Sequence, residues 1–415
     1  MSTAIQQDVR EQAAERFRQL GWPTTRLEEW KYTNVAPIAR GEWKRADAAP
    51  ASFDTHGFTL QGRALAELVF VNGRLANGAT LSPRGGERVP KAGEGLVIKP
   101  ISQAPEEHYA RYADYAEHPF TALNTAEAQD GAYIHVQGAV EGFIHLLFIG
   151  TDGYASHPRN LIVAERGAQL AVVETFVGSG RYFTNAVTEL VAKDGAVIEH
   201  TKVECESIEA FHVGTLQIHQ ERSSSVTSHC VSTGGALVRN EINAALTGPG
   251  ASVVLDGLFV TNGAQHVDNH TVIDHAVAHC DSLEHYKGVL DGTSRGIFDG
   301  KVIVRPDAQK TVSRQVNNNL LLSETAIVDS KPTLEILNDD VKCNHGSTIG
   351  QIEEEPMFYL RSRGIGEEDA RRLLIHAFAG EIVDRIKIEP VRELVRRAMF
   401  AQLKDRLPER RERGR

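Results

Sequence analysis

The hydrophobic pattern at the start of the chain has the period of a helix. Apolar residues recur at intervals of three and four between Ile5 and Leu20, and a glycine and a proline follow shortly afterwards. This spacing places the apolar side chains on one helical face, and glycine with proline commonly ends a helix. The pattern predicts an amphipathic helix over residues 4–20, inside a partly helical N-terminal domain of residues 1–130.

The period changes to two near residue 131. Short segments of alternating apolar and polar residues follow one another through residues 131–355, separated by turn dipeptides such as Asp194-Gly195. Such alternation is typical of half-buried strands. Many short strands without helical crossovers predict either a large antiparallel sandwich or a stack of parallel coils, a β-helix. The three consecutive asparagines at 317–319 favour the stack, because asparagine ladders connect successive coils.

The helical period returns after residue 360. An apolar face predicts one helix, and Pro390 begins a second, within a C-terminal helical domain of residues 356–415 that ends in a basic tail. The apolar surfaces of these helices either cap the open end of the β stack or dock a partner protein. The acidic run at 353–355 is expected to be a solvated turn. The face of the first helix includes Leu373, Leu374, Phe378 and Ile382.

Composition and charge narrow the classes of function. The chain has 415 residues, 41% of them hydrophobic and 24% charged, which is typical of a soluble protein. A net charge of -10 argues against nucleic acid as a partner. The sequence contains no membrane-spanning apolar stretch, and its polar N-terminus is unlike a signal peptide, so we expect a cytoplasmic protein. Its four cysteines should then be free thiols.

Motifs for catalysis are missing from the sequence. It contains no P-loop, no dinucleotide-binding glycine motif, no nucleophile elbow and no C-x-x-C pair. The chain therefore encodes neither a P-loop nucleotide site nor a local cysteine site for zinc or an iron–sulfur cluster. We accordingly expect a protein that is not an enzyme.

Histidines are concentrated between His266 and His285. His266 and His270 lie four residues apart, as do His275 and His279, and on a helix each pair would share one face as metal ligands. The β-branched residues between them favour strands, on which the histidines would form outward-facing rows. A metal-dependent enzyme built on this segment stays an alternative, and so does a polysaccharide-active β-helix protein.

Cys343 and His345 form the other candidate pair. On a strand they point to the same face, roughly 7 Å apart. A thiolate and an imidazole at this separation could bind one iron or zinc ion, with the other ligands supplied from elsewhere. The alternative is a polar pair at the end of the sheet.

Two long runs, residues 268–304 and 308–365, resemble the shared core of SufB and SufD, subunits of the SUF iron–sulfur cluster assembly machine. RLEEWKYTNVAPI at 26–38 resembles the corresponding segment of SufD. KCNHGSTIG and FYLRSRGI fit the SufD branch, and the chain lacks the N-terminal C-x-x-C cluster of the B branch. The resemblance is specific because it is long and keeps the same order.

The resemblance implies a right-handed parallel β-helix with helical regions at both ends. It implies a non-catalytic scaffold subunit that pairs with a SufB-like subunit and binds a SufC-like ABC ATPase. The nascent iron–sulfur cluster would form at the interface of the pair, where His345 and Cys343 match the family's functional residues. No cofactor is expected in the isolated chain, while flavin in the complex and a homodimer of the isolated chain stay open. The ATPase would dock on the C-terminal helix face of Leu373, Leu374, Phe378 and Ile382.

Overall fold

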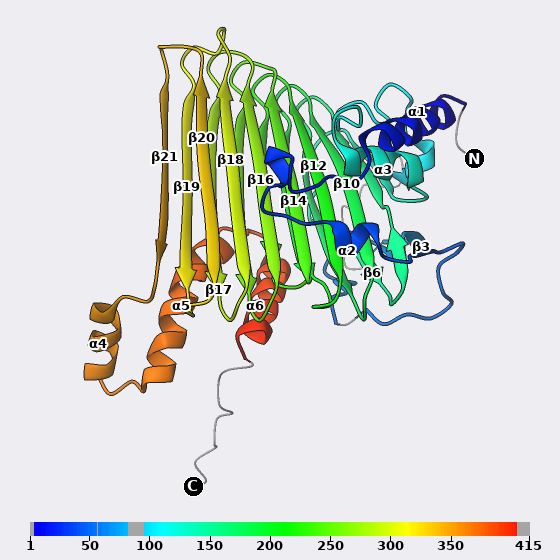
Figure 1. Cartoon of the computed structure of the whole chain (residues 1–415). Coiled ribbons are helices and arrows are strands. Elements are labelled where there is room, and N and C mark those ends of the chain that lie inside the picture. Colours follow the sequence, from blue (N-terminus) through cyan, green and yellow to red (C-terminus); the bar gives the residue numbers. More distant parts are fainter. Residues whose placement is uncertain (1–3, 56, 82–94, 405–415) are drawn as a thin grey trace.

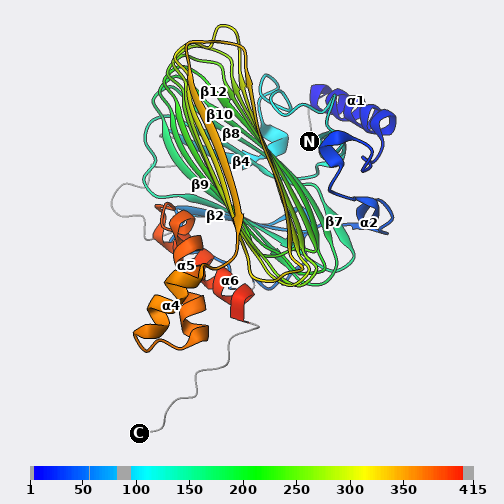
Figure 2. The same ribbon diagram turned by 60° about the vertical axis from the view of Figure 1, so that its left-hand side comes forward.

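The fold is a parallel β-helix of about eight turns, seen in a computed structural model that describes residues 4–55, 57–81 and 95–404 (Figure 1). From residue 159 onward, successive strands alternate between two sheets, so each of these coils contributes one strand to sheet A and one to sheet B. Figure 2 looks along the stack and shows the two sheets enclosing a narrow interior. The prediction of a mainly β fold with a parallel β-helix core and helices at both ends is confirmed.

Sheet A has eleven strands in the described residues and sheet B has ten. Sheet A contains β1 (Lys44–Arg45), β4 (Leu96–Pro100), β5 (Ala132–Val136), β7 (Tyr154–Ser156), β8 (Arg159–Ala164), β10 (Phe183–Ala192), β12 (Phe211–Gln220), β14 (Leu237–Leu246), β16 (His266–His275), β18 (Arg295–Val304) and β20 (Ile327–Ile336). Sheet B contains β2 (Ala66–Val71), β3 (Arg74–Leu81), β6 (Ile144–Gly150), β9 (Gln169–Gly178), β11 (Val197–Cys205), β13 (Ser225–Ser232), β15 (Ser252–Thr261), β17 (Asp281–Leu290), β19 (Val312–Leu321) and β21 (Lys342–Gly350).

Rows of aliphatic side chains hold the coils together. The register of sheet A places one inward residue of each coil directly above the equivalent residue of the coil before it. Stacking buries apolar area that no single coil could hide, and this is the main source of stability in solenoid folds. One such row is Ile134, Ile162, Leu190, Ile218, Ala244, Ile273, Val302 and Leu334.

No asparagine ladder forms at 317–319, so that reason for preferring the β-helix was wrong. In register, Asn317 lies between Tyr286 and Ser347, and the other two asparagines also have neighbours of other types. Asn319 instead donates a hydrogen bond to Asn317 within the same strand, with 2.6 Å between Nδ2 and Oδ1. The stack is specified by the aliphatic rows.

The N-terminal residues cover sheet A and also contribute strands. The helix predicted over 4–20 is confirmed as α1 (Ala4–Leu20), which packs against α3 (Pro119–Glu127). The two short helical turns η1 (Glu28–Trp30) and α2 (Ala36–Ala39) lie over the outer face of sheet A. The turn η2 (Ile101–Gln103) follows β4. Strands β2, β3 and β4 belong to the two sheets, so the sheets already begin within residues 1–130.

The C-terminal helices are α4 (Glu354–Ser362), α5 (Glu367–Val383) and α6 (Glu389–Lys404). Helices α5 and α6 match the two predicted helices, whereas α4 was not predicted. The acidic run at 353–355 leads into α4 instead of forming a turn, which fits the preference for negative charge at a helix N-terminus. No helix among the described residues is long and apolar enough to cross a membrane.

Helices α5 and α6 lie on the outer face of sheet B and leave the open end of the stack uncovered (Figures 1 and 2). The prediction that they cap the open end is therefore wrong. Strands such as β15 and β17 carry outward apolar residues, including Leu258 and Val289, and these pack against Ile375 and Ile382 of α5. The apolar helix faces pack along this apolar stripe.

Candidate functional site

The last coil of the β-helix is an exposed edge that carries both predicted site residues. Cys343 and His345 lie in β21, in register with Ser313 and Gln315 of β19. Ser313 and Gln315 are buried inside the solenoid, so Cys343 and His345 share the inward face, as their parity indicates. No described strand pairs with the outer edge of β21. An inward face without a following coil is open to solvent, and His345 is exposed.

Hydrogen bonds close the interior next to these residues. Ser330 of β20 donates to Asn317 over 2.7 Å, and its hydroxyl lies 2.7 Å from that of Ser347. The side chains of Asn317, Ser330 and Ser347 thus join the two sheets across the last coil. Two isoleucines of the last coil are also exposed, Ile336 at 41% and Ile349 at 49%. Unpaired backbone groups beside exposed isoleucines form an edge that a partner strand or surface can cover.

The donor types at this edge fit iron, although the described residues do not complete a metal site. Cys343 is half-buried against the interior apolar cluster, and burial raises the pKa of its thiol. The thiolate is the ligating form, so a metal would have to displace this proton. No group of three or more His, Cys, Asp and Glu side chains in the described chain is arranged to hold a metal ion. A metal held by Cys343 and His345 would therefore need ligands from a second molecule.

The histidine-rich segment does not form helical metal pairs. His266 and His270 lie in β16 on its outward face, where His266 Nε2 is 2.9 Å from the Thr33 hydroxyl and His270 Nε2 is 3.0 Å from Asp268. His275 faces the interior, 2.9 Å from the hydroxyl of Ser282, so the expected outward row holds only in part. Each of these three histidines has a partner within the fold, which favours a structural role.

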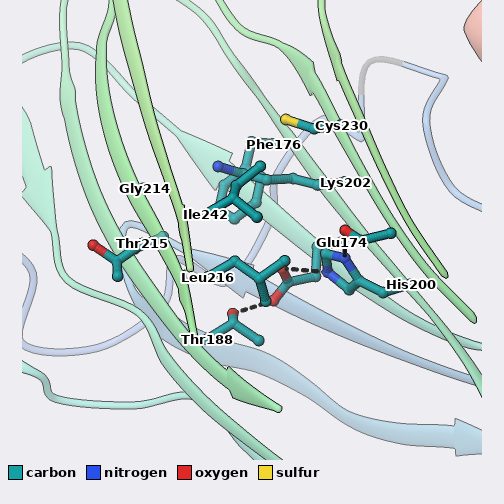
Figure 3. Close-up of a pocket in the computed structure, with 12 residues that line it drawn as sticks. Glu174, Phe176, Thr188, His200, Lys202, Gly214, Thr215, Leu216, Cys230 and Ile242 are labelled. Carbon is teal, nitrogen blue, oxygen red and sulfur yellow. Dashed lines mark hydrogen bonds and ion pairs between the residues drawn. The ribbon is translucent and has the colours of Figure 1, made fainter. Parts of the chain in front are cut away.

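A cluster of charged side chains that was not predicted from the sequence lies inside the solenoid (Figure 3). His200 Nε2 is 3.1 Å from Glu174, which also accepts a hydrogen bond from Thr188 over 2.6 Å. Lys202 Nζ is 2.7 Å from Glu204 and donates to Asn240 over 2.7 Å. The cavity among these side chains is about 10 Å³, room for a single water molecule. The cluster is a satisfied buried network and has no room for a substrate.

The cluster escaped sequence analysis because β11 is buried on both faces. In VIEHTKVEC the alternation suggests that the apolar residues face inward and the charged ones face water. In the structure His200, Lys202 and Glu204 face inward, while Val203 packs outward in the cluster formed with the C-terminal helices. Parity separates the two faces of a strand but does not say which face is inside.

Polar contacts also attach α5 and the turn after it to sheet B. Lys287 forms an ion pair with Glu381 and donates to the carbonyl oxygen of Phe378 over 3.1 Å. Arg385 Nε lies 3.0 Å from Asp256, a carboxyl that is only 1% exposed. Burial raises the pKa of Asp256 to about 6, although Arg385 opposes this rise.

We expect Asp256→Asn to stabilise the protein at pH 7 by up to about 3 kcal/mol. The folded pKa lies above the ordinary value of 3.8, so stability from this group is present below pH 3.8 and lost as the pH rises through about 6. The stability gained by Asp256→Asn should therefore vanish near pH 4. Urea unfolding at both pH values measures it. Asp340→Asn, which breaks an exposed pair with Lys310, is the matched control and should change stability by less than about 1 kcal/mol. Equal gains at both pH values would contradict the expectation.

The four predicted docking residues differ in exposure. Leu373 is 49% exposed, Leu374 and Phe378 are half-buried beside β21, and Ile382 is fully buried against sheet B. Ile382 is thus unavailable to a partner as α5 is packed here. Two aromatic residues that the pattern did not single out are more exposed, Phe358 and Tyr359 of α4.

Comparisons with known proteins match this architecture over most of the chain. The family model of the SUF system FeS cluster assembly SufBD core domain matches residues 147–378, and that of the SufBD protein N-terminal region matches residues 1–142. An iron-sulfur cluster assembly SufBD family protein of Synechocystis is 31% identical, covering 94% of this chain and 89% of the relative. The iron-sulfur cluster assembly protein SufD of Escherichia coli is 29% identical, covering 96% of this chain and 93% of the relative. The chain therefore belongs to the SufBD family of iron–sulfur cluster assembly proteins.

Proposed function

We propose that this chain is a non-catalytic, SufD-like scaffold subunit of an iron–sulfur cluster assembly complex. Its open edge pairs with a SufB-like subunit, and the nascent cluster is the cargo built where the two chains meet. The observation that supports this most is the uncovered last coil, which presents Cys343 and His345 at an edge with unpaired backbone and exposed apolar groups. Cys343 and His345 supply only two ligands, so a metal site at this edge needs further ligands from the second chain.

A SufC-like ABC ATPase would bind the C-terminal helices. Helix α4 and the first half of α5 project beyond the solenoid (Figure 1) and expose Phe358, Tyr359 and Leu373. Exposed aromatic anchors of this kind are typical of binding surfaces. The ATPase would supply the nucleotide hydrolysis for which this sequence has no P-loop. In the isolated chain we expect no bound cofactor.

Replacing His345 tests the proposal directly. His345→Asn removes the imidazole from the interface, so we expect the complex co-expressed with SufB- and SufC-like subunits to assemble but to lose most of its iron and acid-labile sulfide. Iron and sulfide per complex are measured after anaerobic purification, and size-exclusion chromatography follows assembly.

His279→Asn is the matched control, because His279 is an exposed histidine with a left-handed backbone (φ 62°) that asparagine also tolerates. It should keep wild-type iron and sulfide. If His345→Asn also kept both at wild-type levels, His345 would have no part in holding the cluster, and the role of the chain would lie in its interfaces alone.

A further inference from the structure

A polar column runs inward from His345 through the interior of the solenoid. The register of sheet B places Gln315 of β19 directly below His345, and Glu284 of β17 directly below Gln315. Parallel strands lie about 4.8 Å apart, so side chains in one row of successive coils are within hydrogen-bonding reach. Gln315 and Glu284 are both fully buried.

Gln315 is hydrogen-bonded to Glu284, and one of its amide atoms has no partner among the described residues. Its Nε2 donates to Glu284 Oε2 over 2.7 Å. Its Oε1 is buried and has no hydrogen-bond partner among the described residues. Gly300 faces it from sheet A, and a Cβ there would collide with the amide of Gln315. An unpartnered buried acceptor destabilises the fold, and a donor from the next residue in the row would restore the missing hydrogen bond.

Glu284 closes the inner end of the column. Below it in register lies Leu255, which offers no hydrogen bond, and Thr271 faces it from the opposite sheet. Burial raises the pKa of Glu284 to about 7. Because Leu255 blocks the row on one side, the polar column opens only toward His345. In this row of the interior, Gln315 and Glu284 are therefore the polar side chains that lie between Leu255 and the residue that the proposed function places at the cluster.

We propose that Gln315 and Glu284 are positioning residues for His345: Gln315 Oε1 accepts a hydrogen bond from one ring N–H, so that the other ring nitrogen directs its lone pair outward to iron. The inference rests on the proposed function and deepens it. In a neutral imidazole one nitrogen donates and the other accepts, and the partner of the donor decides which nitrogen binds a metal. Such partners commonly affect metal affinity about 10- to 100-fold.

The co-expressed complex tests this with Gln315→Met, which keeps the length of the side chain and removes the acceptor. We expect the complex to assemble with about tenfold less iron. Pulsed EPR of the reduced cluster should show a weakened ¹⁴N coupling, because the imidazole is no longer oriented. Glu284→Gln keeps an acceptor for the Gln315 amide and should retain wild-type iron and ¹⁴N coupling.

Gln220→Met is the matched control. Gln220 is also fully buried, and its Nε2 donates to the Ser252 carbonyl over 2.9 Å and to Ser224. Its Oε1 has no partner among the described residues, but Gln220 lies far from the open edge. It should lose stability in a thermal melt without losing iron. If Gln315→Met matched Gln220→Met in iron and ¹⁴N coupling, the positioning role would be wrong.

Two further variants distinguish a failure of this inference from a failure of the proposed function. If the complex with Gln315→Met does not assemble, Glu284→Leu tests the inference instead. This variant removes the hydrogen-bond acceptor that holds the Gln315 amide, and it leaves the open edge of the solenoid unchanged. Glu284→Leu should then show the same loss of iron and of ¹⁴N coupling, and wild-type values would reject the inference. His345→Asn with full iron would instead overturn the proposed function, and the inference with it.

Discussion

Replacing Lys202 with methionine should lower the free energy of unfolding by about 3 to 5 kcal/mol at pH 7. Lys202 is 6% exposed, and its ammonium group forms the ion pair with Glu204, a residue that is 0% exposed. Burial opposes ionisation of Glu204, but Lys202 and His212 outweigh it and lower its pKa to about 2. Methionine fills the space of the aliphatic chain but leaves a carboxylate inside the solenoid without its main counter-charge.

The loss should depend on pH in a known direction. A folded pKa below the ordinary 4.5 means that Glu204 stabilises the fold above pH 4.5, and that this contribution disappears as the pH falls through about 2. Without Lys202 the pKa of Glu204 rises, so the carboxyl takes up a proton in the folded variant at mildly acidic pH. The difference between wild type and Lys202→Met should therefore shrink as the pH falls from 7 toward 4. Urea unfolding across this range measures it.

The double variant Lys202→Met with Glu204→Gln is the control. Glutamine keeps an acceptor for Ser232 and Asn240, which both donate to Glu204, while it removes the buried charge. Much of the lost stability should return, because a buried ion pair is costly to break but not to replace. A double variant less stable than Lys202→Met would show that the lysine contributes through packing and not through its charge.

Replacing Arg239 with methionine should destabilise the protein by a similar amount, about 3 to 5 kcal/mol, and should free the N-terminal segment. Arg239 is 2% exposed; its guanidinium lies 2.7 Å from Asp268 and 3.0 Å from Glu241. It also stacks on the Trp30 ring, 3.8 Å from the ring centre, and donates to the Glu29 carbonyl over 2.9 Å. The variant leaves two carboxylates under a segment that has lost its anchor.

Two measurements separate global from local loss. Urea unfolding gives the total change, and hydrogen exchange over residues 22–40 reports release of the segment from sheet A. Arg222→Met is the matched control, because Arg222 pairs with Asp194 at the surface with 60% of its side chain exposed, and it should cost less than about 1 kcal/mol. Unchanged exchange over 22–40 would mean that the apolar contacts of Trp30 and Ile38 alone hold the segment.

The periodicity of the sequence determined most of the elements and the mainly β class, but it left a sandwich and a β-helix both possible. The helical period at 4–20, the alternation after 131 and the return of the helical period after 360 correspond to α1, to the coils and to α5 with α6. These patterns are local, because a helix face or a strand face repeats every few residues along the chain. The parity of Cys343 and His345 is local in the same sense, and it placed both residues on one face before the structure was known.

The tertiary structure determined which residues, far apart in the sequence, lie next to one another. Cys343 and His345 face the interior only because β21 pairs with β19, and His345 is exposed only because no described coil follows. The column of Gln315 and Glu284 joins residues some thirty positions apart in sequence through the register of successive coils. Likewise, the C-terminal helices pack on the outer apolar stripe of sheet B and not on the open end. The alternation of residues along one strand does not predict these contacts. In a solenoid, coil length and strand register determine which residues become neighbours.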